Sequence, residues 1–214
     1  MRPVMAGLIG VLLLTGACGS STSTAPTSSS ANSSASSPQP GGSVATSSLT
    51  VMLKDSPFSD AKALLVTFSE VNVHASGDAW VTVPFASGAS TRTCDLKKLE
   101  TAQDVLGVGS LPAGHYTQLR LVVSKATIYL ENASSGAACA PSIAASAGAN
   151  VLVDIPSGEL KLNREFDLAS GGGTTILLDF DGDQSVKLTG NGNGRGNGGG
   201  QYIMTPVIAI VSVH

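Results

Sequence analysis

The clearest candidate for a metal site is a run of alternating aspartates. Asp179, Asp181 and Asp183 stand in the stretch DFDGDQS of this 214-residue chain. Carboxylate oxygens are the ligands that Ca²⁺ prefers, so calcium is the metal to consider. An EF-hand loop requires Gly at its sixth position and Glu at its twelfth, whereas Gly182 is fourth and Gly190 is twelfth here. We favour a structural interpretation, in which Asp179 and Asp181 are outward strand residues and Asp181 starts a turn, and we keep calcium as the lesser alternative.

Three histidines, His74, His115 and His214, are the candidates for acid-base chemistry. None of them stands at a metal-binding spacing such as H-x-x-x-H, and the chain has no G-x-S-x-G motif for a hydrolase nucleophile. His74 precedes a hairpin turn at Gly77-Asp78, so we expect it at a strand end on the surface. His115 lies in PAGHY and is expected in a turn. These residues predict no catalytic site.

The single tryptophan, Trp80, is the best candidate for a ligand contact. If Val81, Val83 and Phe85 face the core, strand alternation places Trp80 on the opposite face. An exposed Trp can stack on a sugar ring or anchor a protein contact. Packing under a loop or against a second sheet is the favoured alternative. Aromatic residues make up only 4% of the chain, which disfavours a carbohydrate-binding face.

Cys18 follows a start that is typical of a secretory signal peptide. Arg2 precedes an apolar run at residues 4–14, which as a helix is about 16 Å long and too short to cross a bilayer. The stretch LTGACGSS resembles the lipobox of bacterial lipoproteins, in which the cysteine is linked to diacylglycerol and becomes the acylated N-terminus. Thr15 departs from the Leu that is common in such boxes. The alternative is a soluble secreted protein cut after Ala17, in which Cys18 has no role.

Residues 18–48 are expected to form a disordered tether. Of the 30 residues at 19–48, 17 are Ser or Thr, none is charged or aromatic, and Val44 is the one branched aliphatic. Such a segment cannot bury enough apolar surface to offset the entropy lost on ordering it. As a flexible chain it spans about 30 Å on average.

The remaining segment, 49–214, is long enough for one domain with a hydrophobic core. Removal of the signal peptide at 1–17 takes away Arg2, so 12 basic residues become 11, against 15 acidic residues, and the net charge becomes −4. No basic cluster exceeds Lys97-Lys98. We therefore expect no nucleic-acid partner.

Cys94 and Cys139 both lie in turn-like sequence, STRTCDL and SSGAACAPS. In an oxidising compartment a bond between them closes a loop of some 46 residues, worth about 4 kcal/mol in the chain-entropy model. The alternatives are two buried thiols or a reactive cysteine, but no His neighbours either residue in sequence. We predict a structural disulfide.

Alternating apolar and polar residues indicate strands throughout the domain. The expected strands lie at residues 49–54, 63–74, 80–85, 115–130, 151–155, 160–168, 174–181 and 207–211. The alternation changes phase near 124–126, which predicts a bulge, and VIAIV at 207–211 is apolar on both faces, which predicts a central strand. One helix is expected at 95–106, and the glycine-rich stretch at 191–200 is expected to be a mobile excursion between strands. These elements predict an all-β fold, a single β-sandwich with one short helix.

The order of several sequence blocks resembles that of a known family. The blocks are LTVMLKDSP (49–57), VTFSEVNVHASGDAWVTV (66–83), LPAGHYTQLRL (111–121), VLVDIPSGELKLNREFDLASGGGTTILLDFDGDQSV (151–186) and YIMTPVIAIV (202–211). They resemble domain-of-unknown-function family 4382, which occurs in bacterial envelope lipoproteins. The L-P-x-G-x-Y element also resembles that of prealbumin-like sandwiches, where the Gly makes a tight turn and the Tyr begins a core strand. The resemblance implies an extracytoplasmic prealbumin-like or immunoglobulin-like β-sandwich and brings no established activity.

The function expected from these observations is that of a non-catalytic module in the cell envelope. It would be anchored to a membrane through lipid on Cys18, face the periplasm or the exterior, need no other cofactor, and bind or support an envelope protein. A carbohydrate-binding module is the first alternative. A hydrolase acting on envelope polymers is the second, and it requires His115 to meet Asp179, Asp181 or Glu131 in one cleft.

Overall fold

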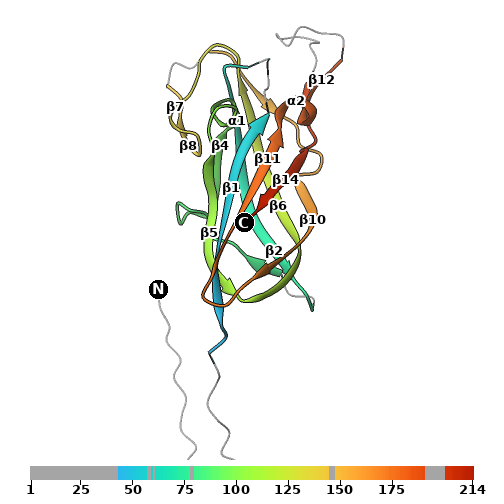
Figure 1. Ribbon diagram of the computed structural model, residues 1–214. Helices are drawn as coiled ribbons and strands as arrows, with labels where there is room; N and C mark the ends of the chain where they lie inside the picture. The colour runs from blue at the N-terminus through green and yellow to red at the C-terminus, as the bar shows by residue number, and fades with distance from the viewer. Residues whose placement is uncertain (1–42, 57–58, 60, 78–79, 145–147, 191–200) are drawn as a thin grey trace, which may run out of the picture. The chain divides into compact units, whose positions relative to one another are not determined.

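The computed structural model describes most of the chain after its first 42 residues (Figure 1). The described residues are 43–56, 59, 61–77, 80–144, 148–190 and 201–214. They belong to one unit of the chain, Ser43–His214. The signal peptide, Cys18, most of the tether and the stretch at 191–200 lie outside the described residues, so what we expect of them stays a prediction. Within the described residues, no helix is long and apolar enough to cross a membrane.

A four-stranded sheet is organised around strand β1, which Figure 1 shows in blue beside orange β11. Its strands lie in the order β14 (Ile208–Val213), β11 (Gly173–Asp181), β1 (Thr46–Ser56) and β5 (Asp104–Pro112). β1 pairs in parallel with β11 and antiparallel with β5. Apolar and polar residues alternate along β1, so Leu49, Val51 and Leu53 are fully buried on one side. The strand begins at Thr46, three residues before the predicted start, and the last residues of the predicted tether therefore belong to the sheet.

A six-stranded sheet is built on the long pair β2 and β6. Its strands are β10 (Glu159–Leu168), β6 (Gly114–Tyr129), β2 (Ala63–Ala75) and β3 (Trp80–Thr82), with β4 (Arg92–Asp95) also paired with β2 and β9 (Asn150–Val153) with β6. All these pairs are antiparallel. Thr67 pairs with Lys125 and Phe68 with Val123, so Ser124 is skipped in the ladder. The predicted bulge is therefore confirmed.

Two further sheets have two strands each. They are β7 (Ser135–Ala137) with β8 (Ala140–Ser142), and β12 (Val186–Thr189) with β13 (Gln201–Met204). The all-β prediction is confirmed, but the described residues form several sheets instead of the single β-sandwich that we predicted. The small sheets escaped prediction because their strands are only three or four residues long, too short for an alternating pattern to be recognised.

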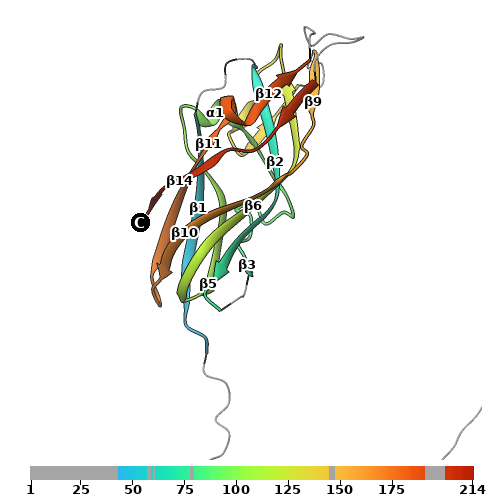
Figure 2. The same cartoon turned by 90° about the vertical axis from the view of Figure 1, so that its right-hand side faces the viewer.

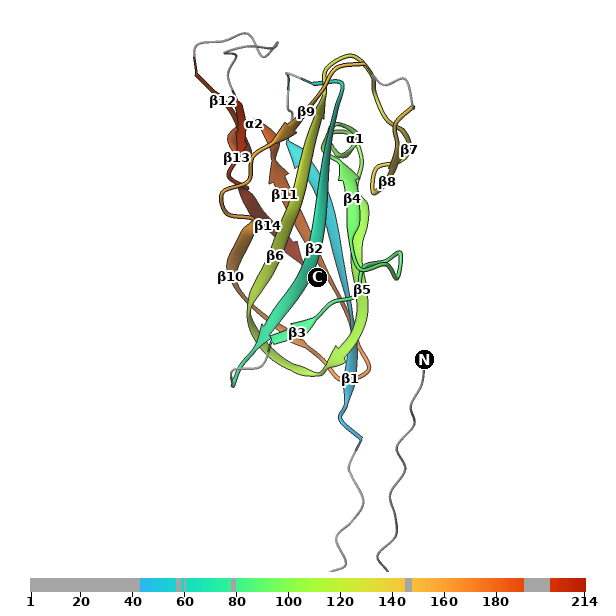
Figure 3. The ribbon, with the colours of Figure 1, turned by 180° about the vertical axis from the view of Figure 1, so that it is seen from behind.

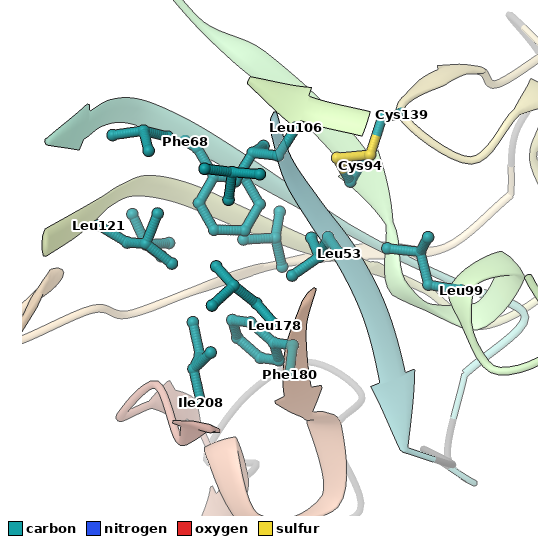
Figure 4. Close-up of a cluster of buried hydrophobic side chains, with 14 of the residues drawn as sticks. Leu53, Phe68, Cys94, Leu99, Leu106, Leu121, Cys139, Leu178, Phe180 and Ile208 are labelled. Carbon is teal, nitrogen blue, oxygen red and sulfur yellow. A yellow bond between two sulfur atoms is a disulfide. The ribbon is translucent and has the colours of Figure 1, made fainter. Parts of the chain in front are cut away.

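The two larger sheets contribute side chains to one hydrophobic core (Figures 2 and 4). Phe68 of β2 meets Phe180 of β11 edge to face, with ring centroids 6.5 Å apart. Leu53 of β1, Leu121 of β6 and Leu178 of β11 are fully buried around this pair. Burial of each such side chain contributes about 1.5–3 kcal/mol, so each sheet depends on the other for its stability.

The L-P-x-G-x-Y element forms the turn from β5 into β6. Gly114 has a φ of 155°, a conformation that residues with a side chain rarely adopt. Tyr116 is 1% exposed, and its hydroxyl donates a hydrogen bond of 2.8 Å to the carbonyl of Pro112. Its ring stacks on Phe166 of β10 with centroids 5.4 Å apart. The expected roles of this Gly and this Tyr are therefore confirmed.

Helix α1 is much shorter than the predicted helix at 95–106. It contains only Leu96–Leu99, and the chain from Asp104 onward belongs to β5. Leu106, which the predicted helix included, reaches the core from that strand. A short helix is marginally stable in water, so the hydrogen bonds between β5 and β1 determine the structure here.

Strand β14 is an edge strand, although VIAIV predicted a central one. Among the described residues it pairs only with β11, and Val207 and Val211 are 43% and 50% exposed. The prediction was wrong because β-branched residues favour the extended backbone whether or not both faces are buried.

The predicted disulfide between Cys94 and Cys139 is present, with the sulfur atoms 2.01 Å apart (Figure 4). It joins β4 to the hairpin of β7 and β8. Beside it, the fully buried carboxylate of Asp95 accepts hydrogen bonds from the amides of Leu64 and Lys97 and from the hydroxyl of Ser134. The bond and the carboxylate together fasten this hairpin to the sheet.

Loss of the disulfide should lower the free energy of unfolding. The double variant Cys94→Ser with Cys139→Ser is expected to lose about 4 kcal/mol, because the unfolded chain regains the freedom of a closed loop. Urea denaturation followed by circular dichroism measures this difference. Reduction of the wild-type protein serves as the control and should give a similar loss. Equal stability of the double variant and the oxidised wild type would contradict the assignment.

Candidate functional site

Two rows of polar side chains cross the outward face of the six-stranded sheet. On β2, Val71 and Val73 are buried in the core, so Asn72 and His74 lie on the opposite face. The strand register continues this face onto β3, β6 and β10. One row is Thr82, Asn72, Arg120 and Lys161, and the other is Trp80, His74, Gln118 and Asn163. We call these two rows, together with Glu70, the Trp80 face.

Arg120 lies over the ring of Trp80 at the centre of this face. The guanidinium carbon is 4.7 Å from the ring centroid, a distance at which a cation and an aromatic face attract each other. The ring of His74 packs beside Trp80, with centroids 4.8 Å apart. Val83 is 1% exposed on the other side of the chain, so the predicted orientation of Trp80 is confirmed.

Hydrogen bonds fix the polar groups around this pair. Arg120 is 3.2 Å from the carboxylate of Glu70, which also accepts a hydrogen bond from Asn72. Thr82 in turn donates to the amide oxygen of Asn72 at 2.8 Å. Because these groups hold one another, Arg120 and Glu70 are preorganised, while Asn72 is itself only 4% exposed.

Two hollows flank the Trp80 face. One, of about 530 Å³, lies over β6 and β10 and is lined by Thr117, Gln118, Asn163, Arg164 and Glu165. The other, of about 160 Å³, lies beside β3 and is lined by, among others, Ser69, Glu70, Thr82 and Phe85. The larger hollow lies across the strands from Trp80, and the smaller one lies farther along β2 and β3.

The histidines lie apart from one another in contact with other residues. His74 shares a hydrogen bond of 3.1 Å with the hydroxyl of Thr117, on the rim of the larger hollow. The backbone of His214 exchanges two hydrogen bonds with Thr175 of β11. Neither residue contributes to a cluster with the third histidine.

His115 pairs with a residue that we did not consider. Its ring lies 2.9 Å from the carboxylate of Asp167 on β10, and Glu131 accepts a hydrogen bond from a backbone amide elsewhere. Asp179 and Asp181 lie at the C-terminal end of β11, which ends at Asp181. The constellation required by the hydrolase alternative is not brought together.

The three aspartates of DFDGDQS make separate contacts with the protein. Asp179 forms an ion pair of 2.6 Å with Lys54 and accepts a weaker hydrogen bond from Ser56. Asp183 accepts a hydrogen bond of 3.4 Å from the amide of Ser59.

Asp181 caps a short helix at the end of β11. Its side chain accepts a hydrogen bond from the amide of Gln184, which starts α2 (Gly182–Ser185), where we predicted a simple turn. The prediction missed the helix because a cap and a turn have the same sequence signal. In the described part of the chain, no group of three or more His, Cys, Asp and Glu side chains could hold a metal ion.

The sequence interpretation overlooked Asp55, which is buried at the end of β1. It is 4% exposed, and its Oδ1 accepts a hydrogen bond of 3.1 Å from the amide of Gly182. Its Oδ2 has no hydrogen-bond partner among the described residues. A buried polar atom without a partner costs about 1–3 kcal/mol. A signal was present, because Asp55 continues the inward series Leu49, Val51 and Leu53.

Burial raises the pKa of Asp55 from its ordinary value of 3.8 to about 8. The negative charges of Glu100, Asp179 and Asp181 add to the rise, and the hydrogen bond from Gly182 opposes it. Asp55 is therefore mainly protonated at neutral pH.

A hollow of about 490 Å³ opens beside this carboxyl group. It lies between the end of β1 and the chain that follows α1, and its lining includes Lys54, Asp55, Leu99, Glu100 and the three residues at 101–103. We call it the Asp55 hollow. Its volume falls within the range of sites for small molecules.

Comparisons with known proteins identify a family but no activity. A family model described as "Domain of unknown function (DUF4382)" matches residues 46–206. No curated protein matches the chain. Among solved structures, a leucine-rich repeat protein from Bacteroides thetaiotaomicron VPI-5482 is similar at 14% identity, with a TM-score of 0.23, over 63% of this chain and 13% of that chain. A similarity this weak carries no argument about fold or function.

Replacement of Asp55 by Asn should change how stability depends on pH. Because the pKa of Asp55 is higher in the folded chain than in the unfolded chain, its contribution to the free energy of unfolding is complete below about pH 4 and falls as the pH rises to about 8. Asn keeps an acceptor for Gly182 and cannot ionise. The variant should therefore gain stability relative to the wild type between these pH values.

Urea denaturation of both proteins at a series of pH values measures this gain. Asp167→Asn, at an exposed carboxylate that pairs with His115, is the matched control for loss of one acidic residue. A difference between Asp55→Asn and wild type that stays constant with pH would contradict the assignment.

Proposed function

This chain belongs to the DUF4382 family, and from that premise we propose that it is a lipid-anchored cell-envelope protein that binds an envelope protein through its Trp80 face. The module acts by recognition and not by catalysis. The lipid is carried by Cys18, and the segment after it holds the domain away from the membrane. The two larger sheets, which share one core, form a sandwich of the prealbumin-like kind.

The observation that carries this proposal is the stacking of Arg120 on Trp80. Trp and Arg are among the residues that contribute most binding energy at protein interfaces. Both are already held in place by Glu70 and His74, so a partner that covers them pays little conformational entropy. The surrounding polar groups suit the rim of such an interface.

Two observations support placement in the envelope. The stretch that ends at Cys18 resembles a lipobox. The disulfide between Cys94 and Cys139 is typical of proteins that fold in an oxidising compartment. Both fit a domain that is exported and then kept at a membrane surface.

A glycan is the second candidate ligand. Gln118 donates to Asn163 at 2.8 Å, and both residues line the larger hollow. Oriented amide groups beside an aromatic ring can recognise sugar hydroxyls. Among the residues that define this face, Trp80 has the one aromatic ring apart from the imidazole of His74. Because there are so few aromatic rings, a glycan is a less favoured ligand than a protein.

Truncation of the central pair should weaken capture of the partner. With the full chain as bait in envelope extract, Trp80→Ala or Arg120→Ala is expected to lower apparent affinity roughly 30-fold, because loss of an interface hot spot costs about 2 kcal/mol. Mass spectrometry of the captured proteins and glycans distinguishes the two candidates.

The control for this capture is Lys187→Ala, at an exposed lysine of the β12 strand, which should bind like wild type. Circular dichroism checks that each variant is folded. Folded variants of Trp80 and Arg120 that capture the same species at wild-type affinity would exclude the Trp80 face as the binding surface.

A further inference from the structure

The Asp55 hollow is a second site, distinct from the Trp80 face. Figure 3 shows α1 at one end of the two large sheets and β3, with Trp80, near the other. The hollow adjoins α1 through Leu99 and lies at the end of β1 opposite Thr46. What it binds is therefore argued independently of the function proposed above.

Asp55 has the features of a ligand-binding group and not of a structural one. It occupies an inward position of β1, next in the series after Leu49, Val51 and Leu53, all of which are fully buried. One oxygen is held by Gly182, and the other has no partner. Asp55 is one of the residues that line the hollow, and this second oxygen is buried beneath the hollow's surface, so a ligand must displace part of the wall to reach it.

The charges around the hollow favour a cation. The negative charges of Glu100, Asp179 and Asp181 act on the carboxyl group of Asp55. Lys54, which lines the hollow, pairs with Asp179, and Lys97 pairs with Glu100. Three carboxylates thus face two lysines, and ionisation of Asp55 adds a fourth negative charge that a positively charged ligand balances.

The arrangement suits an organic cation better than a metal ion. In the described residues no cluster of carboxylates converges closely enough to hold a metal. An ammonium group needs only three acceptors at hydrogen-bond distance, and the lining offers the side chains of Asp55, Glu100, Thr101 and Gln103. We infer that the Asp55 hollow binds a primary ammonium group, supplied by a lysine side chain of a partner or by a free amine.

Binding of an ammonium group must be coupled to the loss of a proton. A cation beside a carboxyl group favours its ionised form, so the proton of Asp55 passes to the solvent when the ligand binds. Since the pKa of Asp55 in the free chain is about 8, the apparent affinity should rise about tenfold for each pH unit up to that value and then level off. A site without this carboxyl group would show no such slope.

The test is an NMR titration of the full chain with aspartate labelled at its carboxyl carbon. Two probes are compared. One is n-butylamine hydrochloride, and the other is Nα-acetyl-lysine methylamide, which keeps the free ε-ammonium group of a lysine side chain. Each should bind, lower the pKa of Asp55 and show the tenfold slope. Tighter binding of the lysine model identifies a protein side chain as the source, and equal binding identifies a free amine; both results support the site.

Two variants make the test specific. Asp55→Asn should abolish the pH slope and weaken binding at least tenfold, and Glu100→Gln, at the surface of the hollow, should weaken binding several-fold while the fold is kept. Asp167→Asn should bind like wild type. The proposal is overturned if neither probe moves the Asp55 signal, if Asp55→Asn binds like wild type, or if Ca²⁺ shifts that signal where the two amines do not.

Discussion

The parallel pairing of β1 with β11 is the constraint on which the rest of the fold depends. The paired residues Lys54 and Asp179 are 125 positions apart in the chain, so this contact closes a very long loop. Closing such a loop costs entropy before the core can compensate for it. The compensation comes from Leu53 and Phe180, which the pairing carries into the shared core. The same pairing brings the end of β1 against α2 and so creates the environment of Asp55.

Much of the fold could be predicted from local pattern, and the failures have physical causes. Alternation located the long strands, the bulge at Ser124 and the outward position of Trp80, because one buried face imposes a period of two. It failed for β14, since β-branched residues suit an edge strand as well as a central one. The predicted helix at 95–106 was too long. The leucines at 96, 99 and 106 fit a helical spacing, and the sequence alone does not show that Leu106 belongs to a strand paired with β1.

The candidate sites differed in how far the sequence could reveal them. Trp80 was singled out because it is the single tryptophan and alternation placed it on an outward face, yet its contact with Arg120 depends on strand register and could not be inferred. Asp55 was missed although its position in an apolar series marks it as buried. The charges that act on it come from Glu100 and Asp179, which only the folded chain places beside it. Long-range electrostatics of this kind has no local sequence signal.

The position of β1 also has a mechanical consequence. A pull on the chain ahead of Thr46 enters the domain along the axis of β1, which is hydrogen-bonded to β11 on one side and to β5 on the other. The load is then shared in shear by two ladders at once, because the bonds run across the strand and not along it. In a hairpin such as β7 and β8, a force that separates the strands from one end would break the hydrogen bonds between them one after another. The strand whose pairing with β11 closes a long loop is therefore also hard to pull out of the sheet, and it is the first strand that a pull on the preceding segment reaches.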